Sequence, residues 1–566
     1  MILLFKVKGK AEHKGKSTLF ISLFKGFIRK THPMLPQASF VLAVTGVLIW
    51  VIRRRHRHGL FARLGVPGPK PDLLWGNWKQ LKKDRIRVME QWIQCYGKVF
   101  GIYLGDKPFM VITDEEIVKE CLIKSTKIFQ DRPMYSVEVE PIISALLLLR
   151  GEKWRRVRSV FNACFTAGKV KTLCRSIDGT VMRLVLKFHD ASRFGDVIDA
   201  HEAARCMVLE TLTRTVLGRQ VGCQTNSNDV PLKSFEVIFR EVDDALLESA
   251  FAYPGLYSIL QLLYPFTSFS KAVQKVMDDA LITLHKPILI LAGYDTTSAS
   301  LAFLLYLLAK HPEEQLKIRA EIVSALRHKE NSDRQAFAET ERTATNFDAK
   351  QDLEPKGWQP SDNVPDLSPP HATNDVVSEA VSSVHEALHD LYGQRADVPQ
   401  TSSNADAVNK ELDEDDVMQL QRLDMVVREG LRLYPTIPIN VMRECMEDTT
   451  ILGQFIPAGT SIFAPPWHIH RNADIWPEPD RFLPERFSPE HRDNVASSYY
   501  PFGLGPRTCV AHRLAMATLK TALYRIVRNF DISLAEDLAD PLPVCVHNIV
   551  LNPAVAIKLK VTRTNI

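Results

Sequence analysis

The sequence predicts a mainly α-helical protein with small β-sheets, preceded by a single N-terminal transmembrane helix. Residues 288–308 are apolar on nearly every side, which is typical of a helix buried through the centre of a large core. Residues 35–52 include no charged side chain and would span about 27 Å as a helix, close to the thickness of the hydrocarbon layer of a bilayer. Two β-rich runs, 99–104 and 109–112, are joined by the turn residues Gly-Asp-Lys-Pro and predict a hairpin in a small sheet.

Length and composition fit one large globular domain. The chain has 566 residues, of which 45% are hydrophobic. Its nine cysteines include no C-x-x-C pair, which argues against a disulfide framework and a zinc cluster and favours a reducing compartment. The net charge of +5 is modest and no nucleic-acid-binding motif accompanies it, so we expect no nucleic acid as a partner.

The N-terminal region divides into a leader, an anchor and a hinge. Residues 1–34 are basic with a single acid, Glu12, and their amphipathic part leaves a mitochondrial transit peptide as an alternative. Residues 35–52 are the predicted anchor in the lipid bilayer, and the basic run that follows predicts a cytosolic C-terminal part at the endoplasmic reticulum membrane. A basic and proline-rich hinge, 53–71, leads to the globular domain, 72–566.

Residues 502–511, Phe-Gly-Leu-Gly-Pro-Arg-Thr-Cys-Val-Ala, predict a tight loop that presents one cysteine. Glycine reaches positive φ without steric cost and proline presets φ, so the backbone turns sharply here. Arg507 points the same way as Cys509 in an extended segment, and a nearby guanidinium favours the thiolate. A predicted helix at 511–529 places Cys509 at its positive end. Cys509 is therefore a candidate metal ligand, and an ordinary buried cysteine is the alternative.

This loop resembles the haem-ligand loop of the cytochrome P-450 superfamily. The matching positions are Phe502, Gly505, Arg507, Cys509 and Ala511, the last standing where glycine is commoner. The resemblance implies the P-450 fold, heme b as the cofactor, Cys509 as the axial ligand of the haem iron and Phe502 as part of the cofactor-binding loop. Residues 165–169 are similar to the microsomal steroid- and drug-oxidising branch, which also includes thromboxane synthase.

Three arginines and a tryptophan extend the resemblance to the haem propionates. Trp154 and Arg158 lie four residues apart on one helix face and offer donors that suit an anionic carboxylate. In the resembled family this pair meets a haem propionate. Arg443, at the end of a strand-like run, and Arg507 are by the same resemblance further propionate contacts.

Residues 291–297, Leu-Ala-Gly-Tyr-Asp-Thr-Thr, bring an acid and an alcohol into the apolar central helix. Polar groups there are costly unless they have partners or a task. The segment resembles the (Ala/Gly)-Gly-x-(Asp/Glu)-Thr-Thr signature of the family, which implies that Thr296 holds the oxygen molecule by a hydrogen bond and Asp295 links it to a proton supply. The alternative is that Thr296 bonds back to its own helix.

A buried structural charge network is predicted from Glu429, Arg432 and Arg486. The first two lie three residues apart on one helix face, and Arg486 belongs to a Pro-Glu-Arg-Phe segment. Together they resemble the E-x-x-R helix and the P-E-R-F segment of the family.

Two segments depart from the family pattern. Residues 271–290, with Pro287 among them, form a shorter connection than the family has, so either the central helix begins late with Pro287 in its first turn or part of the pocket wall is missing. Residues 330–410 are rich in acids and show little apolar periodicity, which predicts a disordered acidic insertion in a surface loop. A binding segment is the alternative there.

The resemblance implies a haem-thiolate monooxygenase that inserts one atom of O2 into a hydrophobic small molecule, such as a xenobiotic, a steroid or a fatty-acid-like compound. No G-x-G-x-x-G fingerprint is present, so NADPH and flavins are expected only in a separate NADPH-cytochrome reductase, with cytochrome b5 as an optional second partner. Two alternatives stay open: a peroxide isomerase resembling thromboxane synthase, and a catalytically impaired haem-binding variant owing to the shortened segment before Pro287.

Overall fold

The computed structural model describes residues 34–133, 145–218, 221–225, 262, 264–266, 270–271, 286–347, 411–439, 441–491, 498–547 and 549–564. The chain divides into two compact units, Met1–Leu60 and Phe61–Ile566. Helix α2 (Met34–His58) of the first unit includes both the predicted anchor and the basic run after it. Within the described residues, no helix combines the length and the apolar composition that a membrane crossing requires.

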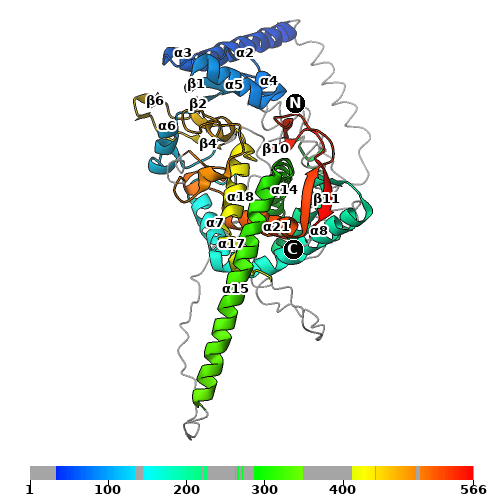
Figure 1. Cartoon of the computed structure of the whole chain (residues 1–566). Coiled ribbons are helices and arrows are strands. Elements are labelled where there is room, and N and C mark those ends of the chain that lie inside the picture. The colour runs from blue at the N-terminus through cyan, green and yellow to red at the C-terminus, as the bar shows by residue number, and fades with distance from the viewer. Residues whose placement is uncertain are drawn as a thin grey trace, which may run out of the picture. The chain divides into compact units, whose positions relative to one another are not determined.

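Figure 1 follows the elements along the chain. The helices after α2 are α3 (Leu60–Arg63), α4 (Trp78–Lys83), α5 (Arg85–Tyr96), α6 (Glu115–Lys119), the π-helical turn η1 (Glu120–Lys124), α7 (Gly151–Cys164), α8 (Ala167–Phe194), α9 (Ala200–Leu217), η3 (Tyr264–Phe266), α14 (Lys286–Lys310), α15 (Pro312–Phe347), α17 (Glu414–Gln419), α18 (Gln421–Leu433), α19 (Pro466–Ile469), η4 (Pro484–Phe487), η5 (Gly505–Arg507) and α21 (His512–Asn529). The strands are β1 (Val99–Leu104), β2 (Lys107–Ile112), β3 (Ile198–Asp199), β4 (Val441–Glu444), β5 (Thr449–Ile451), β6 (Gln454–Ile456), β7 (Ser461–Ala464), β8 (Phe530–Leu534), β9 (Val544–His547), β10 (Val550–Pro553) and β11 (Lys558–Arg563).

The predicted hairpin is present as the edge of a four-stranded sheet. The strand order is β1-β2-β7-β4, with β2 and β7 parallel and the other pairs antiparallel. The turn is Gly105-Asp106, because Lys107 already pairs with Leu104. Side chains on both faces of β1 and β2 are buried in separate apolar clusters, which explains why the two strands are nearly continuous apolar runs.

The three smaller sheets lie in the second unit. They have the orders β3-β11-β8, β10-β9 and β5-β6, and every pairing in them is antiparallel. Strand β10 contacts α14, which brings a segment near the end of the chain beside the central helix.

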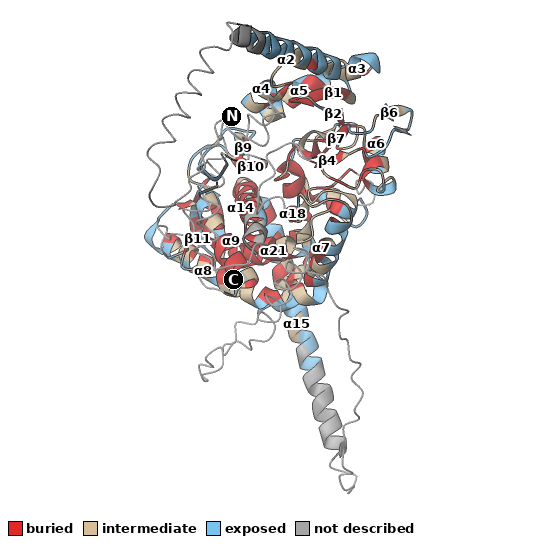
Figure 2. Cartoon of the chain, turned by 180° about the vertical axis from the view of Figure 1, so that it is seen from behind, coloured by how far each residue is buried: buried red, intermediate tan, exposed pale blue. Residues whose placement is uncertain are grey.

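Helix α14 is the centre of the helical core, as the apolar run predicts. It packs against α9, α18, α21 and β8 in addition to β10, and Figure 2 shows that most of its described length is buried. The helix begins at Lys286, so Pro287 stands in its first turn, where the absence of a proline N–H costs nothing. The first of the two alternatives for Pro287 is therefore confirmed, and residues 272–285 before it lie outside the described residues.

The predicted disordered insertion begins too early. Helix α15 continues to Phe347, so residues 330–347 are helical. A solvated helix needs no apolar periodicity where charged pairs support it, and Glu330 accepts from Arg334 at 2.7 Å one turn later. Lys329 also binds Asp413 at 2.9 Å, at the start of α17. The rest of the predicted insertion, 348–410, lies outside the described residues.

Candidate active site

The cysteine loop is a closed turn whose shape depends on glycine. Gly503 and Gly505 have φ values of 75° and 68°, in the left-handed region that favours glycine. The N–H of Cys509 donates to the carbonyl oxygen of Phe502 at 2.9 Å and closes the loop. A Cβ on Gly505 would lie 1.8 Å from the carbonyl oxygen of Leu122 in η1, so the loop packs directly on that turn. The sequence prediction of a tight, glycine-dependent turn is confirmed.

Cys509 lies half-buried just before α21. Burial raises the pKa of its thiol, while the backbone N–H of Ala511 and the charges of Arg158 and Arg132 lower that pKa. The charges that lower the pKa of Cys509 are those of Arg158 and Arg132, whereas the sequence analysis expected Arg507 to favour the thiolate. The guanidinium of Arg507 is held elsewhere, and the cations that act on Cys509 come from other parts of the chain.

Arg507 is buried by partners that fix its direction. Its Nη2 donates to Asp131 Oδ1 at 2.8 Å and to the carbonyl oxygen of Leu149 at 2.7 Å. Its guanidinium stacks on Trp154, 4.1 Å from the ring centroid. Burial and the nearby charge of Arg132 lower the pKa of Arg507 to about 10. In the described part of the chain its Nη1 is buried without a hydrogen-bond partner.

Arg443 is buried on β4 with only carbonyl oxygens as partners. Its side chain is 2% exposed, and it donates to Met442 at 2.7 Å and to Leu504 at 3.2 Å. Burial and the charges of Arg132 and Arg507 lower the pKa of Arg443 well below its usual value. No carboxylate among the described residues forms an ion pair with it, so its charge is not neutralised by this part of the chain.

Arg158 and Arg132 complete a group of four guanidinium groups beside the loop. Arg158 Nε donates to Asn162 Oδ1 at 3.0 Å, and burial lowers the pKa of Arg158. Trp154, which was predicted to work with Arg158, stacks on Arg507. The sequence analysis missed Arg132, because the only signal was its position between Asp131 and Pro133, and nothing in the sequence shows that Asp131 binds Arg507.

The central helix α14 is accessible to solvent at one place, around Ala292. Ala292 is exposed and Gly293 and Thr296 are half-buried, while Tyr294, Asp295 and residues 297–309 of α14 are buried. Thr296 Oγ1 donates to the carbonyl oxygen of Ala292 at 2.9 Å, which is the alternative that the sequence left open. α14 also packs against α21, the helix that Cys509 precedes.

Asp295 lies on a different side of α14 from that open position. It is 4% exposed, and its Oδ2 accepts from Asn552 Nδ2 of β10 at 3.4 Å. Burial raises the pKa of Asp295, although Asn552 and the charge of Arg205 lower it in part. The sequence analysis missed Asn552, because 257 residues separate it from Asp295 along the chain.

Glu429, Arg432 and Arg486 are brought together. Arg432 donates to both carboxylate oxygens of Glu429, at 2.7 and 2.8 Å, and Arg486 Nε donates to Glu429 Oε1 at 3.3 Å. Glu429 and Arg432 are both fully buried. Arg432 also donates to the carbonyl oxygens of His470, Pro479 and Arg481. These contacts therefore hold α18 against η4 and the segment before it.

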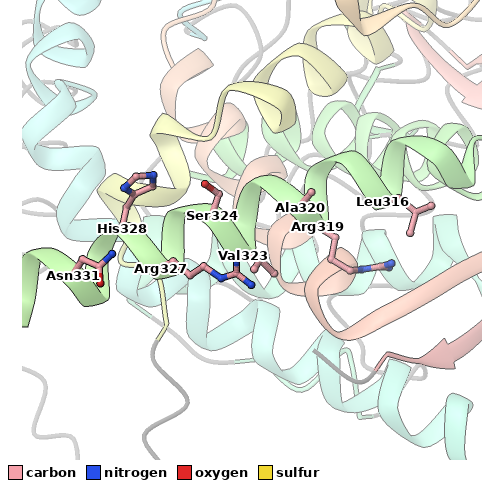
Figure 3. Close-up of a pocket in the computed structure, with 8 residues that line it drawn as sticks. All are labelled: Leu316, Arg319, Ala320, Val323, Ser324, Arg327, His328 and Asn331. Carbon is pink, nitrogen blue, oxygen red and sulfur yellow. The ribbon is translucent and has the colours of Figure 1, made fainter.

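Figure 3 shows a hollow that is separate from these residues. All eight residues that line it belong to α15, from Leu316 to Asn331. Arg319 is the buried member, and it is used by the fold, since it donates to Asp531 at 2.8 Å and to the Val527 carbonyl oxygen at 3.0 Å. We therefore place the candidate site at the cysteine loop and not in this hollow.

The chain matches the family described as Cytochrome P-450 over residues 66–281, 257–341 and 401–561. It is 27% identical to cytochrome P-450 3A29 of Sus scrofa, over 90% of this chain and 94% of that protein. It is 27% identical to cytochrome P-450 3A9 of Rattus norvegicus, over 94% of this chain and 97% of that protein. It is 28% identical to cytochrome P-450 3A6 of Oryctolagus cuniculus, over 92% of this chain and 96% of that protein. Residues 342–400, which the family match leaves out, fall inside the predicted insertion.

Proposed function

Because the chain belongs to the cytochrome P-450 family, we propose that it inserts one oxygen atom of O2 into a hydrophobic small molecule of the xenobiotic, steroid or fatty-acid class. Membership makes the protein a P-450 monooxygenase with heme b as its cofactor. The observation that supports the site most strongly is Arg443, a buried guanidinium without a carboxylate partner in the described part of the chain.

The residues present fit the carboxylates of heme b. Arg507 Nη1 is a buried donor without a hydrogen-bond partner in the described part of the chain, and Arg443 is a buried cation whose partners are carbonyl oxygens. Two propionates would supply the negative charge that both arginines need. Arg158 and Arg132 would lower the cost of a thiolate at Cys509, the residue that would ligate the iron. When bound, the haem supplies the oxidising chemistry, and a thiolate ligand favours O–O cleavage.

Residues of α14 would handle protons on the open side of that helix. The Thr296 hydroxyl donates its own proton to Ala292, which leaves its oxygen lone pairs turned outward to accept a hydrogen bond on the open side of the helix. Asp295 is the nearest carboxyl along the helix and is the proposed store of protons for that side. The apolar residues of α14 exclude water from the rest of the core.

We infer that electrons come from a separate NADPH-dependent reductase, with cytochrome b5 as an optional second donor, and that the protein works at the endoplasmic reticulum membrane. The apolar side chains of α2 from Phe40 to Ile52 are largely exposed and basic residues follow them, which supports attachment to a lipid bilayer. Deleting residues 1–60 is expected to move the protein from the microsomal pellet to the supernatant, and an unchanged distribution would contradict this location.

The proposed reaction is tested with the full-length, haem-loaded protein, an NADPH-dependent reductase and lipid vesicles. A panel of steroids, fatty acids and drug-like compounds is supplied under 18O2, and the products are analysed by mass spectrometry. We expect NADPH-dependent products that contain one labelled oxygen atom, and none with the Cys509→Ala variant. A product rearranged from a lipid peroxide in the absence of NADPH would overturn the proposal in favour of the isomerase alternative.

A further inference from the structure

The carboxyl group of Asp295 is held by a residue from the far end of the chain. Asn552 lies on β10 and is 4% exposed, as Asp295 is. Its Nδ2 donates to Asp295 Oδ2 at 3.4 Å and to the Val550 carbonyl oxygen at 3.3 Å. The first of these hydrogen bonds is long, so Asn552 restrains the carboxyl group without fixing it in a single geometry.

The other end of the same amide is unused. Asn552 Oδ1 is buried and has no hydrogen-bond partner among the described residues. A buried carbonyl without a partner costs free energy, so an Asn at this position needs an explanation other than stability. This oxygen belongs to the same side-chain amide whose Nδ2 contacts the carboxyl group of Asp295. A proton on that carboxyl group would satisfy the oxygen.

A side-chain amide matches both protonation states of a carboxyl group. Its N–H groups donate to the carboxylate, and its oxygen accepts from the carboxylic acid after rotation about the terminal bond. An acid that passes protons during catalysis alternates between these two states. A leucine at position 552 would form a hydrogen bond with neither the carboxylate nor the carboxylic acid of Asp295. An aspartate there would favour only the protonated form of Asp295.

The charged and titratable groups that face Asp295 come from α9 and β9. Arg205 of α9 binds the Tyr294 hydroxyl at 3.0 Å, and its charge and that of His547 of β9 lower the pKa of Asp295. Cys545 of β9 is paired with Asn552 in the β10-β9 register, and burial, followed by the charge of Asp295, raises the pKa of its thiol. Burial acts in the opposite direction on Asp295 and raises its pKa overall.

We propose that Asn552 is a positioning residue for the monooxygenase reaction: it holds the carboxyl group of Asp295 in both protonation states and thereby sets the pH range in which Asp295 takes up and releases protons. This inference rests on the proposed function. Asn552 acts through Asp295 and touches neither the open side of α14 at Ala292 nor the cysteine loop in the described structure.

The test compares Asn552→Leu and Asn552→Asp with the matched control Asn529→Leu. The control removes a half-buried amide on α21 that donates to the Arg525 carbonyl oxygen at 2.7 Å. All variants are first loaded with haem and checked by their carbon monoxide spectra, so that a misfolded variant or a failure of the proposed function is recognised before the pH series begins. Asn552→Asp is nearly isosteric and keeps the test valid if the leucine variant does not fold, provided that its infrared spectrum is read against the double variant Asp295→Asn/Asn552→Asp, because the new carboxyl group has a C=O band of its own.

Two readouts follow the protonation of Asp295. Infrared titration follows the carboxylic-acid C=O band that is absent from Asp295→Asn, and turnover is measured as product formed per NADPH across pH. Removing the amide donor raises the pKa of Asp295, so fewer molecules have an ionised Asp295 at a given pH. We expect the infrared midpoint and the acid limb of turnover to move up together by about one pH unit in Asn552→Leu and further in Asn552→Asp.

The control Asn529→Leu should keep both midpoints at the wild-type pH. The proposal is overturned if the Asn552 variants bind haem and carbon monoxide normally but retain the wild-type infrared midpoint. It is also overturned if the infrared midpoint moves while the pH dependence of turnover does not, because Asn552 would then affect Asp295 without affecting the reaction.

Discussion

Arg432 and Arg443 are both buried guanidinium groups, and their surroundings differ in one decisive respect. Arg432 has the carboxylate of Glu429 at 2.7 Å and three carbonyl oxygens, so the chain itself completes its partners. Arg443 has two carbonyl oxygens and the repulsion of Arg132 and Arg507. A buried cation without a counter-charge is costly, so the second arginine is explained by a ligand and the first by the fold.

This difference predicts the effect of replacing Arg443. In the haem-free protein, Arg443→Met removes a buried charge without a carboxylate partner, and the free energy of unfolding should rise by about 1–3 kcal/mol. Haem affinity should fall in the same variant, because a propionate loses its partner. Denaturant unfolding of the apoprotein and haem titration measure the two effects. The exposed Arg156→Met serves as the control, and a loss of apoprotein stability in Arg443→Met would contradict the assignment.

His470 provides a pH-dependent prediction at the same scale. It is fully buried, its Nε2 accepts from the N–H of Tyr500 at 3.1 Å, and burial together with Arg432 lowers its pKa to about 3. The unfolded chain therefore binds a proton below about pH 6.5 that the native protein does not bind. Its contribution to stability is complete above that pH and is lost as the pH falls toward 3.

Between pH 6.5 and pH 5 this one histidine should cost the wild type about 2 kcal/mol of unfolding free energy. The variant His470→Gln can still accept from Tyr500 and has no group that titrates there. Urea unfolding at several pH values should therefore show a smaller acid loss in the variant than in the wild type. Equal losses would mean that the acid sensitivity arises elsewhere.

Among the elements, the contact between the cysteine loop and η1 is the one that a single methyl group should disrupt. Gly505→Ala would place a Cβ 1.8 Å from the Leu122 carbonyl oxygen, whereas Gly503 has similar φ but nothing within 4 Å of its added Cβ. Gly503→Ala should lower the free energy of unfolding only by the local backbone strain, about 1 kcal/mol, and should keep its haem. Gly505→Ala should lose most of its haem. Haem content per purified chain measures both, and equal retention would contradict the packing.

The sequence predicted elements well where the signal was local. The hairpin at 99–112 and the helix after Cys509 each follow from residues within one short window. The start of α14 at Lys286, with Pro287 in its first turn, was one of two alternatives that the sequence left open. The end of α15 was missed because charged i,i+4 pairs give no apolar period. The direction of Arg507 was also missed, because its partner Asp131 lies in a distant part of the sequence.

The same distinction applies to the site. Cys509, Asp295 and Thr296 could be named from motifs, because each motif is contiguous. Arg132 and Asn552 could not, since their importance comes from neighbours that only folding brings near. A buried polar residue on a strand, such as Asn552, looks in the sequence like any other asparagine.

For the whole molecule, we expect residues 336–410, the end of α15 and the segment after it, to be dispensable for haem binding. The family match leaves out residues 342–400, and Lys329 binds Asp413 at 2.9 Å, so the two ends of the segment start close together on the body of the domain. Replacing residues 336–410 by a short Gly/Ser linker should leave haem content and the melting temperature nearly unchanged. A loss of haem on deletion would support the alternative that this segment has a binding role.

The most direct test of the central claim, that Cys509 is a thiolate ligand to haem, is the carbon monoxide difference spectrum of the dithionite-reduced, full-length protein. We predict a Soret maximum of the thiolate-ligated type in the wild type and its loss in Cys509→Ala. A maximum shifted to the blue in the wild type, or a purified chain that binds no haem, would contradict the assignment of Cys509 and of the arginines around it.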